Sequence, residues 1–170
     1  MDIDKFWKIL DRSRKNAEGD PEAQVDELEA ELRKLSPEEI IEFDAIFRKH
    51  HQGAYDWALW GAAYIIGGGC SDDGFADFRG WLISRGGKAY ETALSDPDSL
   101  VKFVKEDDGE CQIEGFEYAS SKAWEAVTGR TADEFPVTYS SGIREPSGKK
   151  WEESELDALF PRLAKKFGYE

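Results

Sequence analysis

Four charged residues in the central part of the chain could do chemistry: Asp56, Asp72, Asp73 and Arg79. Clustered carboxylates can hold a hard divalent cation, and two of them can act as acid and base when their pKa values are split. Acids in the first turn of a helix also interact favourably with the helix dipole and its free N–H groups. No spacing here reproduces an EF-hand loop. We therefore favour a structural role for this candidate polar cluster, predict no metal site and assign no catalytic residue.

Asp56 directly precedes an aromatic, apolar segment that begins at Trp57, so its carboxylate is expected to be partly buried. A buried charge needs a partner, or it becomes neutral. Arg79 lies on the next predicted helix, and we hypothesise an ion pair between Asp56 and Arg79.

A run of three glycines, Gly67, Gly68 and Gly69, precedes a predicted helix, an arrangement that can bind phosphate through backbone N–H groups. The lysine of a phosphate-binding loop is missing, and Asp72 and Asp73 place negative charge where the phosphate would lie. We predict no cofactor.

His50 and His51 stand near the end of a predicted helix and could supply a base or a metal ligand. Adjacent residues do not share a helix face, so the pair is not expected to bind one ion. Histidine near the negative end of the helix dipole is the simpler interpretation.

Two tryptophans, Trp60 and Trp81, are the candidate walls of a ligand pocket between helices. Aromatic side chains more often simply fill a core, and that alternative stays open.

Residues 18–44 are rich in acids and hold most of the net charge. We predict a candidate partner face formed by Glu22, Asp26, Glu27, Glu29 and Glu31. The alternative is a solvated surface, because runs of charge commonly have no other role.

The 170-residue chain carries a formal net charge of −14. Such a charge opposes direct binding to nucleic acid or to anionic membranes, because phosphates would be repelled, and favours a basic protein partner. No apolar run approaches membrane-spanning length, and the first residues lack the pattern of a signal peptide. We expect a cytoplasmic protein in which Cys70 and Cys111 are reduced thiols.

Helical spacing of apolar residues predicts an all-α fold, a single irregular multi-helix domain of residues 1–170. Helix starts are indicated at Asp2, at Asp20-Pro21 and, as a capping box, at Ser36-Pro37-Glu38-Glu39. The centre is predicted to be a buried helical hairpin within residues 53–86, joined by the glycine turn before Ser71. Residues 1–129 form the predicted core, 130–150 an irregular loop, and 151–170 a C-terminal helix that Pro161 kinks or restarts.

Two central motifs carry a family resemblance: Leu59-Trp60-Gly61-Ala62-Ala63-Tyr64, and Gly68-Gly69-Cys70-Ser71-Asp72-Asp73-Gly74-Phe75 with the following Phe78-Arg79-Gly80-Trp81-Leu82-Ile83. Together with Phe6-Trp7 and Asp96-Pro97-Asp98-Ser99-Leu100, they resemble the bacterial domain-of-unknown-function family 4240 (DUF4240). The resemblance covers about residues 1–127. It implies a bacterial, mostly cytoplasmic protein and supplies no catalytic residue.

The leading functional hypothesis is a non-enzymatic interaction or regulatory protein that engages a basic partner through its acidic N-terminal helices. One alternative is a metal-dependent or acid–base enzyme that uses Asp56, Asp72, Asp73 and Arg79. Another is an immunity-type protein that neutralises a basic toxin by charge complementarity.

Overall fold

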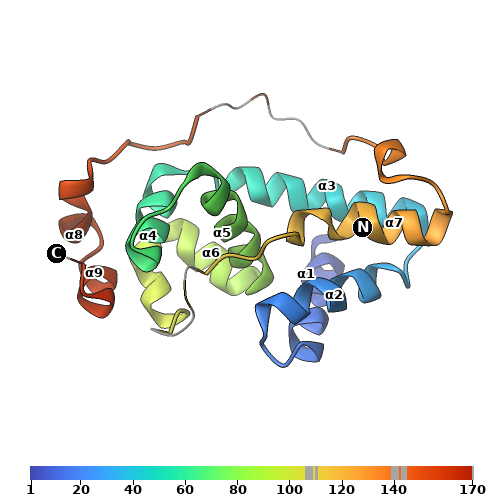
Figure 1. The fold of residues 1–170 in the computed structure, drawn as a ribbon, viewed down its shortest axis with the longest axis horizontal. Coiled ribbons are helices and arrows are strands. Elements are labelled where there is room, and N and C mark those ends of the chain that lie inside the picture. Colours follow the sequence, from blue (N-terminus) through green and yellow to red (C-terminus); the bar gives the residue numbers. More distant parts are fainter. Residues whose placement is uncertain (106–108, 110, 139–141, 143–144, 170) are drawn as a thin grey trace.

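The predicted all-α class is confirmed, because 70% of the computed structural model is helical and its described residues contain no strand. Those described residues are 1–105, 109, 111–138, 142 and 145–169. In chain order the α-helices are α1 (Ile3–Asn16), α2 (Pro21–Leu32), α3 (Pro37–Gly53), α4 (Trp57–Gly67), α5 (Asp72–Ser84), α6 (Gly87–Ser95), α7 (Ala119–Thr128), α8 (Leu156–Leu159) and α9 (Pro161–Phe167) (Figure 1). Short 3-10 helices are η1 (Pro97–Lys102), η2 (Phe116–Tyr118), η3 (Ala132–Glu134) and η4 (Glu153–Glu155).

The helix starts lie where the capping residues predict them. The backbone N–H of Lys5 donates to Asp2 at 2.7 Å, and Asp20 accepts from the first turn of α2. Ser36 and Glu39 form a reciprocal capping box at the start of α3. Each cap satisfies N–H groups that have no partner within the helix, which fixes the boundary locally.

The two central helices follow one another through a short turn, as predicted. Gly68 ends α4 with a φ of 65°, and the Ser71 side chain accepts a hydrogen bond from Gly74 N at the start of α5. Their rings meet at Trp60 and Phe75, whose planes are 9° apart with centroids 4.9 Å apart. Otherwise they pack on different neighbours, because α4 contacts α9 and η1, whereas α5 contacts α3 and α6.

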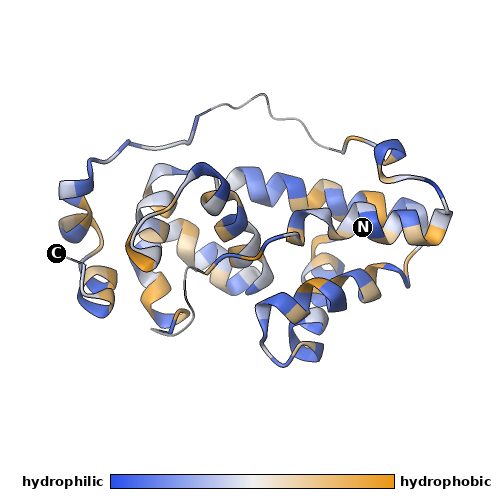
Figure 2. Cartoon of the chain, viewed as in Figure 1, coloured by the Kyte–Doolittle hydropathy of each residue, from blue (hydrophilic) through white to orange (hydrophobic). Residues whose placement is uncertain are grey.

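A connected buried cluster extends from Phe6 of α1 through Phe47 of α3 and Phe78 of α5 to Leu163 of α9. Apolar and polar residues alternate along the helices, as expected when each helix has one face in such a core (Figure 2). No described helix is both long enough and apolar enough to cross a membrane.

The predicted C-terminal helix of residues 151–170 is interrupted at Pro161, which restarts it, one of the two outcomes that the proline suggested. Pro161 begins a new helix, α9, and Phe160 between α8 and α9 has non-helical angles (φ −129°, ψ 61°). Proline lacks an N–H and clashes with the preceding turn, which explains the break. The described part of the predicted loop 130–150 is irregular apart from η3, and residues 139–141, 143 and 144 lie outside the described residues.

Candidate functional site

The four members of the candidate polar cluster are not brought together. Asp56 caps α4 by accepting hydrogen bonds from Ala58 N (2.8 Å) and Leu59 N (3.3 Å). Its second carboxylate oxygen accepts from the Ser147 hydroxyl at 2.8 Å. The Asp56 carboxylate therefore satisfies backbone and hydroxyl donors, the structural role that the sequence favoured.

The predicted ion pair between Asp56 and Arg79 is wrong. Arg79 is buried, and its guanidinium donates to the carbonyl oxygens of His51 (3.0 Å) and Phe75 (3.3 Å). The same guanidinium lies 4.7 Å from the centre of the Tyr55 ring. Carbonyl oxygens and an aromatic face, not a carboxylate, are therefore the partners of Arg79 inside the core.

Asp72 and Asp73 lie in the first turn of α5, both exposed. Among the described residues no three histidine, cysteine or acidic side chains are placed to share a metal ion. An enzyme that depends on convergence of Asp56, Asp72, Asp73 and Arg79 is therefore not supported by their geometry.

The two candidate pocket tryptophans have separate environments. The Trp60 indole donates to the Cys70 carbonyl at 3.0 Å and is stacked between Trp57 and Phe75. Trp81 is buried and borders a small cavity of about 240 Å³ beside Arg85 and Phe103. Trp60 is not among the residues that line this cavity.

The two histidines occupy the last turn of α3, at the negative end of its dipole. The His50 ring hydrogen-bonds through Nδ1 to Ile46 O at 2.8 Å and borders a cleft of about 580 Å³ with Lys49. The His51 ring donates from Nε2 to Ala76 O at 2.9 Å, and burial, followed by the nearby Arg79 charge, lowers its pKa to about 4. The two rings point to different neighbours, so they cannot bind one ion as a pair.

Two of the five acids of the predicted partner face, Glu29 and Glu31, are engaged within the protein. Glu31 is buried and pairs with Arg12 of α1 at 2.8 Å. The hydrogen bond from Lys34, followed by the one from Arg12, lowers the pKa of Glu31. Glu29 is also buried and pairs with Arg33 (3.1 Å) and with Lys122 of α7 (3.5 Å). Glu22, Asp26 and Glu27 remain at least partly exposed on α2.

Glu22 of α2 borders a cleft that is rich in acids, and we call it the acidic cleft. The cleft measures about 480 Å³, and it is lined by Glu22, Val25, Asp77, Gln112, Glu114, Gly115 and Lys122. Its walls come from α2, α5, α7 and the residues that precede η2. Three carboxylates thus face one space, and the ammonium of Lys122, which also pairs with Glu29, is the cation among the lining residues.

Asp77 has the most perturbed environment in the cleft. Burial raises the pKa of its carboxyl, and the negative charges of Glu117, Glu114 and Asp73 raise it further. Glu117 is itself held by Arg48 at 3.1 Å. An approaching cation stabilises a carboxylate that is half-buried among other carboxylates, because opposite charge favours its ionised form.

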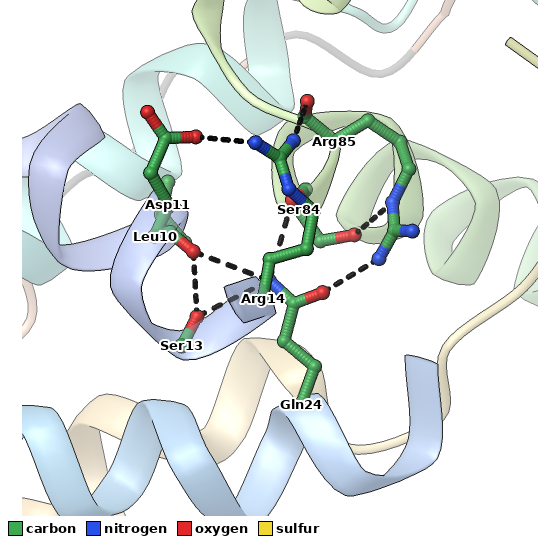
Figure 3. A network of polar contacts seen from close by, with 7 residues as sticks. All are labelled: Leu10, Asp11, Ser13, Arg14, Gln24, Ser84 and Arg85. Atoms are coloured by element: carbon green, nitrogen blue, oxygen red, sulfur yellow. Dashed lines mark hydrogen bonds and ion pairs between the residues drawn. The ribbon is translucent and has the colours of Figure 1, made fainter. Parts of the chain in front are cut away.

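A buried polar network holds the wall that α2 contributes to this cleft (Figure 3). The Gln24 amide is fully buried and donates to Ser13 Oγ (3.1 Å), Ser84 O (3.3 Å) and Leu10 O (3.4 Å). Its carbonyl oxygen accepts from Arg85 at 2.6 Å. Gln24 therefore links α2 to α1 and to the end of α5, and this fixes the neighbouring Glu22 and Val25 against the cleft.

Sequence reasoning identified Glu22, but it did not single out Gln112, Glu114 or Lys122. The residues before η2 lack helical periodicity, so the pattern does not show which face they present. A weak signal was available in the acids spaced at Asp73 and Asp77, which share one face of α5.

A family model described as "Protein of unknown function (DUF4240)" matches residues 1–126, a range that contains every residue lining the acidic cleft. No curated protein and no solved structure matches the chain.

Proposed function

The chain belongs to the DUF4240 family, and we propose that it is a protein-interaction domain whose acidic cleft binds a lysine- or arginine-rich segment of a partner. The observation that carries the proposal is the position of Asp77, half-buried among Glu114, Glu117 and Asp73 with a raised pKa. Charges of one sign that are held together in a partly desolvated cleft attract a cation more strongly than the same charges spread over a surface.

The shape and chemistry of the cleft fit a basic side chain. The carboxylates of Glu22, Asp77 and Glu114, which come from three different segments, offer acceptors in the cleft, and Gln112 also lines it. Val25 gives the cleft one apolar wall, against which the methylene stem of a lysine or arginine can pack. An arginine would fit best, because its planar guanidinium can bond two carboxylates at once.

The overall charge of −14 supports the same class of partner. It disfavours nucleic acid and anionic membrane surfaces as ligands and accelerates encounter with a basic protein. We place the domain in the bacterial cytoplasm, in keeping with its family resemblance. A basic toxin bound by an immunity-type protein is one partner of this chemistry.

Affinity capture from the native host tests the proposal with matched variants. The cleft variant carries Asp77→Asn and Glu114→Gln. The control carries Glu91→Gln and Asp26→Asn, which remove the same two charges from exposed positions outside the cleft lining. A partner retained by wild type and control, lost from the cleft variant and released by salt supports the proposal. Equal retention by the cleft variant contradicts it.

A further inference from the structure

A second cleft is lined by residues of α1, α3 and α6, and it shares no lining residue with the acidic cleft. It measures about 580 Å³, which is within the size range of clefts that bind small molecules. Lys49 and His50 of α3 line it, and none of the described residues in its lining is acidic. Because the chain has a net charge of −14, such a lining is unusual in it, and we call this cleft the basic cleft.

The Lys49 ammonium is available to a ligand. Its side chain is exposed and has no hydrogen bond or ion pair with any residue that the structure describes. The preceding residue, Arg48, is by contrast paired with Glu117 at 3.1 Å. A cation near the end of a helix is favourable through the helix dipole alone, so the charge of Lys49 by itself does not indicate a ligand.

His50 adds a second polar group, and its ring is already fixed in place. Nδ1 lies 2.8 Å from Ile46 O, which can only accept, so Nδ1 carries hydrogen and Nε2 is the nitrogen left for a ligand. The ring stacks on Phe6 with centroids 5.5 Å apart and has edge contacts with Trp7 (5.2 Å) and Tyr90 (5.1 Å). Such preorganisation lowers the cost of binding, because the ring loses little freedom when a ligand arrives.

The carbonyl groups at the end of α3 are satisfied within the protein. His50 O accepts from the Tyr90 hydroxyl at 2.7 Å and from Ala54 N at 3.0 Å. His51 O accepts from the Arg79 guanidinium at 3.0 Å. Free carbonyl groups would repel an anion at this end of the helix, and these hydrogen bonds reduce that repulsion.

The remaining lining gives the basic cleft an apolar surface. Ile3 is 44% exposed and is neither part of the buried core nor packed against it. Ile46 and Tyr90 line the same space. A Cβ atom at Gly53 would lie 3.1 Å from the Tyr90 hydroxyl, so glycine leaves room beside this ring. An apolar body can therefore pack next to the two basic side chains.

We propose that the basic cleft binds a small organic acid, a single carboxylate attached to an apolar body about the size of a phenyl ring. Lys49 donates to the carboxylate, and the charged form of the His50 ring supplies a second donor at Nε2. The body packs on Ile3 and Ile46. Inorganic phosphate fits less well, because it has no apolar part and its larger charge is repelled more strongly by a protein of charge −14. This site is independent of the basic partner proposed for the acidic cleft.

Three probes test the chemistry: 3-phenylpropionate, its neutral analogue 3-phenylpropanamide, and inorganic phosphate. Carbon-13 labelling of the isoleucine methyl groups makes binding visible at the cleft by NMR, because Ile3 and Ile46 line it. Ile83 and Ile113 are buried outside its lining and serve as internal references. We expect 3-phenylpropionate to shift the Ile3 and Ile46 signals saturably and the amide to bind about tenfold more weakly, since it lacks the charge-assisted hydrogen bond. Phosphate should shift neither signal.

Matched variants assign the binding to the cleft. Lys49→Met removes the charge and keeps the length, so it should weaken binding of the acid about tenfold and leave binding of the amide unchanged. Lys15→Met removes an exposed lysine near the end of α1, outside the cleft lining, and should change neither affinity. Ile3→Glu should abolish binding of the acid by repulsion, whereas Ile3→Gln should retain it. Both variants should fold, because Ile3 is exposed and an acid in the first turn of α1 is favourable.

Three results would each overturn the proposal. The first is the absence of saturable shifts of Ile3 and Ile46 with 3-phenylpropionate. The second is equal affinity for the acid and the amide, which would show that Lys49 does not contact the ligand. The third is an equal effect of Lys49→Met and Lys15→Met, which would assign the preference for the acid to the general charge of the protein. Phosphate binding as tight as that of the acid also contradicts a site that needs an apolar body.

Discussion

The guanidinium of Arg79 donates a 3.0 Å hydrogen bond from Nη1 to the carbonyl oxygen of His51. That carbonyl belongs to the last turn of α3, where carbonyl groups have no partner within the helix. Nearby, the Tyr90 hydroxyl donates to His50 O at 2.7 Å, and burial raises the pKa of Tyr90 to about 12. Side chains of α5 and α6 thus close the end of α3.

Replacing Arg79 by alanine should destabilise the protein by about 3 kcal/mol, since it removes two charge-assisted hydrogen bonds and a contact with the Tyr55 ring. The measurement is urea unfolding at pH 7. The pKa of His51 should rise in the same variant, because the Arg79 charge is one cause of its low value. Asp56→Asn, which keeps hydrogen-bonding capacity at the α4 cap, should leave the His51 pKa unchanged. An equal shift of that pKa in both variants would contradict the contacts described.

Acidification should destabilise the protein through His51. Its pKa is about 4 in the folded protein and near 6.5 in the unfolded chain, so between these pH values the unfolded chain binds a proton that the folded protein does not. Stability is therefore present above pH 6.5 and falls as the pH drops towards 4. The loss between pH 7 and 4.5 amounts to about 2 kcal/mol for a shift of this size.

Comparison with His51→Gln isolates that effect. Glutamine can still donate to Ala76 O but does not titrate, so the variant should lose about 2 kcal/mol less than wild type over the same pH range. Carboxylates with lowered pKa, such as Glu31, also lose stability in acid, but they do so equally in both proteins. Parallel pH profiles of wild type and variant would show that His51 titrates normally.

The hydrogen bonds of Gln24 predict that a substitution at this position strongly lowers the free energy of unfolding, even when it keeps the side-chain volume. Gln24→Leu keeps the volume but leaves Ser84 O and the Arg85 guanidinium without their bonds to the amide, so we expect a loss of about 3 kcal/mol in urea unfolding. Gln52→Leu is the matched control, because the buried Gln52 amide nitrogen has no hydrogen-bond partner among the residues that the structure describes. It should cost far less than Gln24→Leu, and a larger cost at Gln52 would contradict this account.

Local signals made much of the fold predictable. Asp20-Pro21 and the Ser36–Glu39 capping box mark helix starts within a few residues, and a positive φ at Gly68 ends α4 as its glycine suggested. Partners across the fold were not predictable in this way. Several acids and carbonyl oxygens in the sequence were possible partners for the Arg79 guanidinium. The packing of α3 on α5 determines that His51 O is the acceptor.

The candidate partner face shows the same limit. The sequence indicates that Glu29 and Glu31 lie on α2, but it does not show that Arg12 and Lys122 reach them from α1 and α7. The acidic cleft needs Asp77 and Glu114 from two other segments, which come together only when α2, α5 and α7 have packed. The site is therefore harder to predict from the sequence than the fold. The helices follow from local propensity, whereas the site depends on distant segments coming together.

Removal of the Asp98 carboxylate should release the C-terminal segment, residues 147–169, before the rest of the protein unfolds. Asp98→Ala removes three acceptor contacts at the start of α9, which together stabilise its docking by about 3 kcal/mol. Trypsin should then cleave the variant at Lys165 and Lys166 at least tenfold faster than wild type. Asp157→Ala, an exposed acid on α8, is the control and should leave the cleavage rate nearly unchanged. Equal rates for Asp98→Ala and wild type would show that apolar packing alone holds the segment.

Asp77→Asn should stabilise the isolated protein and weaken the proposed binding of a basic segment in the acidic cleft. Because the Asp77 pKa is raised, the folded protein binds a proton more readily than the unfolded chain, and the carboxylate becomes unfavourable as the pH rises through the folded pKa. The neutral amide removes that cost, so we expect a small gain in stability at pH 7, reduced by solvent screening of this partly exposed group, that disappears below about pH 4. Glu91→Gln, an exposed acid of α6, serves as the control and should show no comparable pH dependence. If Asp77→Asn makes the protein more stable and weakens the binding of a basic partner, Asp77 serves binding at some cost to stability. If the variant is less stable than wild type, Asp77 has a role in the fold.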